Sequence, residues 1–94
     1  MRKIYQSIPD VPQAVANKAI DIIERHFAAT GVRRAADLPE ESRVHLLREL
    51  QSFFHAELPY TRGKESDVLF DLGSRQGGRW KAAFRWLARV FRSE

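Results

Sequence analysis

The sequence predicts an all-α fold: a small single-domain helical bundle with two long antiparallel helices, a short third element and a C-terminal cationic amphipathic helix. Its 94 residues are 44% hydrophobic and 30% charged, which is typical of one globular domain. Apolar residues recur at helical spacing in long segments, and two of these segments follow an Asp-x-Pro-Gln/Glu start. We therefore expect one domain over residues 1–94, with helices at about 11–29, 38–58, 66–72 and 79–92.

The first long helix is expected to begin after Asp10, which can act as N-cap, with Pro12 in the first turn and Gln13 reaching back as in a capping box. Its apolar side is formed by Val15, Ala19, Ile20, Ile22, Ile23, His26 and Phe27. On such a face we expect His26 to be a core histidine held by one hydrogen bond. Gly31 is a natural stop.

The second long helix is expected to start in the same way 27 residues later, with Asp37 as N-cap and Pro39 in the first turn. Its broad apolar face comprises Leu46, Leu47, Leu50, Phe53, Phe54 and Leu58. Pro59 ends the helix. The two helices are predicted to form an antiparallel hairpin across 31–36, and the width of its apolar face also favours self-association, as in a dimer.

The segment 66–72 fits a short helix with Ser66 as N-cap, but Val68, Phe70 and Leu72 also alternate as in a strand. We favour the helix because only residues 4–8 could supply a partner strand. Gly73 is expected to end the segment, and 73–78 to form a flexible loop. A loop of that length fits a helix-turn-helix motif poorly.

The last helix carries an aromatic ridge formed by Trp80, Phe84, Leu87 and Phe91. On another flank, four cations at positions i, i+4, i+8 and i+11 form what we call the basic row: Lys81, Arg85, Arg89 and Arg92. Trp86 lies on the side away from this row. We expect the ridge to complete the core and the row to face water.

The net charge of +4 belongs to the C-terminal third of the chain. Residues 1–58 contain eight basic and eight acidic side chains, whereas residues 59–94 contain eight basic and four acidic ones. Between Gly73 and Ser93 there are six basic residues and no acidic residue. Attraction to an acidic partner is therefore expected in this region.

Sequence features that would indicate catalysis, metal binding or membrane insertion are weak or missing. The pairs Ser42–His45 and Ser52–His55 come with no orienting acid or oxyanion site implied by sequence, and His45 with Glu41 and Glu49 looks like a solvated helix face. There is no cysteine, no secretory signal, and no apolar run near the roughly 20 residues that span a bilayer. We expect a cytoplasmic protein that is not an enzyme and needs no metal or cofactor.

These observations favour a small binding protein that recognises another protein. Trp and Arg are enriched at binding hot spots, so the candidate residues are those of the last helix and its approach: Arg75, Arg79, Lys81, Arg85, Trp86, Arg89 and Arg92. The alternative is a nucleic-acid-binding protein that places the same cations, with Arg62 and Lys64, on phosphates. Peripheral membrane attachment is the least favoured interpretation, because the apolar ridge cannot be both core and lipid anchor.

Overall fold

The structure, a computed structural model, describes residues 11–93 as an all-α domain with no strand in this range. Its α-helices are α1 (Gln13–Thr30), α2 (Glu40–Glu57), α3 (Glu65–Arg75) and α4 (Gly78–Ser93). Two short 3-10 helices, η1 (Ala35–Asp37) and η2 (Pro59–Thr61), lie in the connections before α2 and α3. The predicted all-α class is confirmed for residues 11–93, and the strand alternative for 66–72 is wrong. The proposed partner strand, 4–8, lies outside the described residues.

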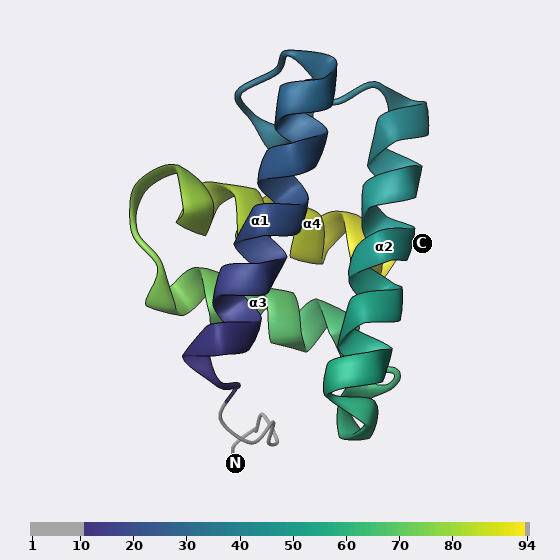
Figure 1. Ribbon diagram of the computed structural model, residues 1–94, viewed down its shortest axis with the longest axis vertical. Coiled ribbons are helices and arrows are strands. Elements are labelled where there is room, and N and C mark those ends of the chain that lie inside the picture. The colour runs from purple at the N-terminus through teal and green to yellow at the C-terminus, as the bar shows by residue number, and fades with distance from the viewer. Residues whose placement is uncertain (1–10, 94) are drawn as a thin grey trace.

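The helices form two hairpins that cross each other. α1 and α2 run side by side in opposite directions, and α3 and α4 form a second antiparallel pair that lies behind and across the first (Figure 1). The second pair is joined by residues 76–77 alone, so the expected loop over 73–78 is wrong. The connection between α1 and α2 also takes part in the fold, because η1 packs against α4.

Both long helices begin directly after a proline. α1 and α2 start 27 residues apart, at Gln13 and Glu40, and each is 18 residues long. The carbonyl oxygens of Pro12 and Pro39 accept the first bonds of the helices, for example from the Arg43 amide at 2.9 Å. The repeated start predicted from the sequence is present, but each proline occupies the N-cap instead of the first turn, so both helices begin two residues later than predicted. The fixed φ of proline suits this position.

The predicted capping roles of the acidic residues and of Ser66 are not found in the described chain. Asp37 belongs to η1, and its carboxylate accepts a hydrogen bond from Arg34 Nε at 3.1 Å instead of one from a helix amide. Asp10 lies outside the described residues. Ser66 lies inside α3, where its hydroxyl donates to the Ala88 carbonyl of α4 at 3.1 Å, because the helix already begins at Glu65.

The predicted ends of the long helices are confirmed. Gly31 adopts the left-handed conformation, with φ of 75°, and its amide donates to the Phe27 carbonyl at 2.8 Å. A residue with a side chain is strained in that conformation, which explains the glycine. α2 ends at Glu57, two residues before Pro59.

Gly73 does not end α3, which continues to Arg75. It is buried against α4: a Cβ added at Gly73 would lie 3.0 Å from Phe84 Cβ and 3.3 Å from the Lys81 carbonyl oxygen. The glycine therefore allows the two helices of the second hairpin to approach closely. The local sequence pattern does not reveal this role.

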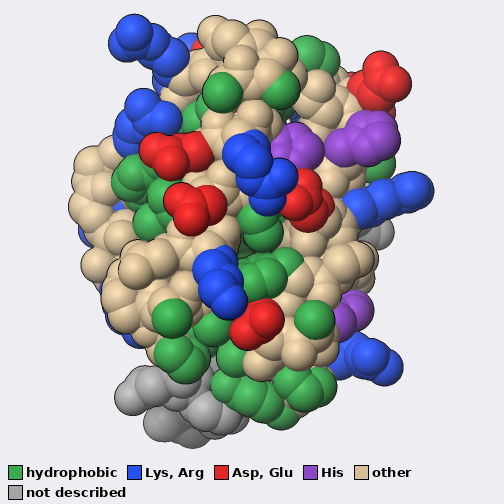
Figure 2. All heavy atoms as spheres, viewed as in Figure 1, with side chains coloured by type: hydrophobic (Ala, Val, Ile, Leu, Met, Phe, Trp, Pro, Cys, Tyr) green, Lys and Arg blue, Asp and Glu red, His purple; other side chains and the backbone are tan. Residues whose placement is uncertain are grey.

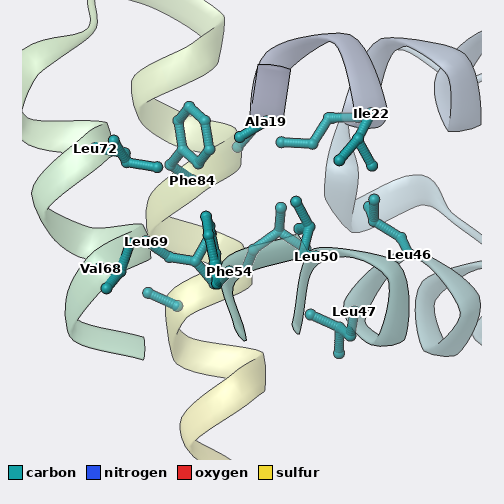
Figure 3. Packing of buried hydrophobic residues seen from close by; sticks show 14 of the residues in the cluster. Ala19, Ile22, Leu46, Leu47, Leu50, Phe54, Val68, Leu69, Leu72 and Phe84 are labelled. Carbon is teal, nitrogen blue, oxygen red and sulfur yellow. The ribbon is translucent and has the colours of Figure 1, made fainter. Parts of the chain in front are cut away.

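The core lies between the two hairpins. Leu50 and Phe54 of α2 meet Leu69 of α3 and Phe84 of α4 there (Figure 3), and all four are fully buried. Leu87 is also buried, while Trp80 and Phe91 pack against the core from its edge. The ridge of α4 thus completes the core as predicted. α3 and α4 together bury the apolar face of the first hairpin, so the wide exposed face from which self-association was predicted is not present in the described residues.

Candidate binding surface

The basic row lies along the edge of α4 that faces α3. Arg85 marks this edge, because its guanidinium carbon stands 5.2 Å from the centre of the Phe70 ring of α3. Helical spacing places Lys81 and Arg89 one turn to either side, with Arg92 close to the same line. Arg89 and Arg92 are exposed and Lys81 is half-buried. Four cations are therefore aligned on one strip of surface.

Arg85 is held in place by packing. Its Nε is buried and has no hydrogen-bond partner within residues 11–93, and its Cγ lies 3.5 Å from the position of a Cβ added at Gly73. The stem of the side chain thus rests on α3, and the guanidinium covers Phe70. An arginine fixed in this way loses less conformational entropy when it binds an anion than a freely rotating one.

Phe70 brings an exposed aromatic surface to the row. Its side chain is 45% exposed, which distinguishes it from the fully buried Leu69 and Leu72 of the same helix. Asp67 and Asp71 lie near it on α3 by helical spacing. Asp71 is already paired with Arg75 at 2.7 Å, whereas Asp67 is exposed.

The other candidate residues lie away from the row. Arg75 donates to the Val11 carbonyl at 2.9 Å as well as to Asp71, so it fastens the start of the described chain to α3. Arg79 stands 4.8 Å from the centre of Trp80, and Trp86 lies under Arg43 of α2 at 5.9 Å. Arg79 and Trp86 occupy the opposite edge of α4, where they pack toward the first hairpin.

Arg79 also borders an open groove at the end of α1. The groove mixes both signs of charge and is lined by Asp21, Glu24, Arg25, Phe27, Ala28, Gly31, Val32, Arg33 and Arg79. The ring of Trp80 stacks on that of Phe27, with centroids 6.1 Å apart. This aromatic pair joins α4 to α1.

The face formed by α1 and α2 has no single sign of charge. Acidic, basic and histidine side chains are intermixed over it (Figure 2). Three of these side chains interact with one another: Glu49 accepts hydrogen bonds from His26 at 2.8 Å and from Arg25 at 3.1 Å. The bond from His26, followed by those from Arg25, lowers the pKa of Glu49 despite its partial burial. The predicted hydrogen bond of His26 is present, but its side chain is half-buried and is not part of the core cluster, so the prediction of a core histidine is only partly correct.

A second histidine–glutamate pair was not foreseen from the sequence. Glu65 is buried and contacts His55 of α2, and the Gly63 amide donates to the same carboxylate at 3.2 Å. Burial alone would raise the pKa of Glu65, but hydrogen bonds from His55 and from the amides of Glu65 and Gly63 outweigh it and lower the pKa.

Glu65 supplies the orienting acid that the sequence did not imply for the Ser52–His55 pair. Ser52 is nevertheless exposed, and no hydrogen bond joins it to His55 within the described residues. The His55–Glu65 contact therefore serves to connect α2 to α3.

Two further observations concern residues 11–93. No group of three or more histidine, aspartate or glutamate side chains in this range is arranged to hold a metal ion. None of its helices combines the length and the apolar character needed to cross a bilayer.

The basic row with Phe70 is thus a surface on which aligned cations lie beside an exposed aromatic side chain. Comparisons with models of known protein families, with curated proteins and with solved structures give no match.

Proposed function

We propose that this protein is a non-enzymatic binding module that recognises an acidic surface of a partner protein through the basic row of α4. The observation that carries the proposal is the distribution of charge: no acidic residue occurs between Gly73 and Ser93, and Lys81, Arg85, Arg89 and Arg92 share one edge. A single-signed strip of this kind attracts an oppositely charged surface and accelerates its association.

The composition of the surface also supports a protein partner. Arginine and aromatic side chains are enriched at protein–protein interfaces, and here Arg85 and Phe70 form one joined unit. Arg89 and Arg92 are exposed beside it and can contribute to the rim of an interface.

The test is a titration of a labelled peptide that carries a block of glutamates, followed by fluorescence anisotropy. Arg89 and Arg92 are both exposed, so the double variant R89Q/R92Q is expected to fold normally. It should weaken peptide binding by about three- to tenfold, because two charge contacts are lost. The effect should shrink at high salt.

The matched control is K18Q/R48Q, which removes the same amount of charge from exposed positions on α1 and α2. We expect this control to bind the peptide as the unaltered protein does. Equal affinities of R89Q/R92Q and K18Q/R48Q would show that net charge alone is responsible and would contradict the proposal.

Nucleic-acid binding is the second candidate function, favoured by the regular spacing of the same four cations along one helix. The probe is a labelled single-stranded oligonucleotide titrated over a range of salt concentrations. If the row contacts phosphates, R89Q/R92Q should reduce the slope of log affinity against log salt by about one to two. Micromolar or tighter binding at physiological salt would favour this candidate over an acidic protein.

A further inference from the structure

Phe70 of α3 lies beside the basic row, and charge attraction alone gives it no role in binding. Nearly half of its side chain is exposed, although α3 offers buried positions to its other large apolar residues. Arg85 lies over the ring, so apolar surface and a fixed positive charge are presented together. An exposed aromatic ring beside a strip of cations can pack against an apolar side chain of a partner.

Resting on the proposed function, we infer that the partner is an acidic protein segment that carries an aromatic or long aliphatic anchor residue. Its carboxylates meet the cations of the row, and the anchor packs on Phe70 beside Arg85. The close attachment of Arg85 to α3, shown by its buried Nε, keeps this combined surface ready for binding.

The charges around Phe70 favour a protein segment over nucleic acid. Asp67 is exposed one turn before Phe70, on the side away from the row. A nucleotide whose base packed on Phe70 would bring its phosphate close to this carboxylate, because nucleic acid carries a charge at every nucleotide. A peptide can place neutral residues next to Asp67 while its acidic residues contact the basic row. The surface, with cations on one side of Phe70 and a carboxylate on the other, therefore suits a peptide.

The experiment compares two labelled peptides, each with a block of glutamates, a central residue and a neutral tail. The central residue is tryptophan in one peptide and alanine in the other. We expect the protein to bind the tryptophan peptide about five- to tenfold more tightly, as for a well-packed aromatic contact. F70A should remove this preference, because the anchor then loses its partner.

The matched control is Y60A, which truncates the similarly exposed aromatic residue of η2 and should leave the preference intact. Since Phe70 is on the surface, F70A is expected to fold, and far-UV circular dichroism verifies this; F70Q provides a second variant. Retention of the tryptophan preference in both F70A and F70Q would overturn the inference.

The two levels of the proposal fail in different ways. If F70A keeps the tryptophan preference while R89Q/R92Q weakens the binding of both peptides, the inferred anchor contact is wrong and the acidic-partner proposal stands. If R89Q/R92Q changes the affinity for neither peptide, the acidic-partner proposal itself is wrong. If a single-stranded oligonucleotide binds more tightly than the tryptophan peptide at physiological salt, the surface serves nucleic acid and the inference is overturned.

Discussion

At the scale of single residues, two histidine–glutamate pairs join neighbouring helices. His26 of α1 contacts Glu49 of α2, and His55 of α2 contacts Glu65 of α3. A partly buried carboxylate that accepts several hydrogen bonds stabilises the folded state as long as it is ionised. The pKa of each glutamate is lowered, so both pairs link folding to pH in the same direction.

The pH dependence of folding tests the Glu65 pair. A glutamate whose pKa is lower in the folded state stabilises the protein fully above its unfolded pKa, about 4.3, and loses this contribution as the pH falls below it. E65Q should therefore unfold at lower urea concentration than the unaltered protein near neutral pH. The difference should narrow as the pH falls below about 4.3.

The control for this prediction is E57Q, which alters an exposed glutamate at the end of α2. It should leave the urea midpoint nearly unchanged across the same pH range. A constant difference between E65Q and the unaltered protein from neutral to acid pH would mean that the ionisation of Glu65 contributes nothing to stability.

Asp37 offers a second test at this scale. Its carboxylate pairs with the exposed side chain of Arg34 instead of capping α2. Exposed ion pairs contribute little to stability, so D37A should leave the urea midpoint nearly unchanged. A loss as large as that from removing a helix cap would show that Asp37 does reach the amides of α2.

His26 and Glu65 show how far single residues can be predicted from sequence. His26 lies on an apolar helical face, and that position predicts a core histidine with one hydrogen bond. The hydrogen bond is present, but the side chain is half-buried because it reaches Glu49 of α2. Glu65 pairs with His55, which is ten residues away and separated from it by η2. No periodicity relates the two positions, because the path of the connection decides whether they meet.

At the scale of helices, the boundaries that depend on local chemistry were predictable. Four residues act on the backbone of their own segment: the prolines that precede Gln13 and Glu40, then Gly31 and Pro59. Gly73 carries the same local signal as a helix stop, yet lies inside α3. Its role depends on the distance to α4, and this tertiary contact overrides the local tendency of glycine to end a helix.

The substitution G73A tests this role. Alanine favours a helix over glycine by about 1 kcal/mol. A Cβ at this position would press on the backbone of α4 and on Phe84 Cβ, neither of which can rotate away, and such overpacking costs about 1–3 kcal/mol. We expect a net loss of about 1 kcal/mol in the free energy of unfolding, measured with urea.

G77A is the comparison for G73A, because a Cβ at Gly77 would meet open space. It should change the free energy of unfolding by much less. If G73A stabilises the protein, helix propensity outweighs the contact, and α3 and α4 can separate slightly without cost.

At the scale of the whole molecule, stability depends on the layer of side chains shared by the two crossed hairpins (Figure 3). Leu50 lies in this layer and is fully buried. L50A should lower the free energy of unfolding by about 2–5 kcal/mol, because it removes buried methyl groups and leaves a cavity. A nearly unchanged urea midpoint would show that the hairpins do not depend on each other.

The candidate surface was predictable from the sequence in part. The spacing of Lys81, Arg85, Arg89 and Arg92 places them on one strip, and the absence of acidic residues in α4 makes that strip positive. The sequence could not show that Phe70 would be exposed beside Arg85, because Phe70 lies in a short apolar segment that reads equally well as core. It also could not separate Arg75, which binds Asp71 and the Val11 carbonyl, from the cations of the row.

The central claim is that the edge of α4 beside α3 is the surface that meets an acidic partner. The most direct measurement is nuclear magnetic resonance of the labelled protein during titration with the glutamate–tryptophan peptide. We predict that the amide signals that shift belong to the basic row and to the part of α3 around Phe70. Shifts concentrated on the exposed face of α1 and α2, around Lys18 and Arg48, would contradict the claim.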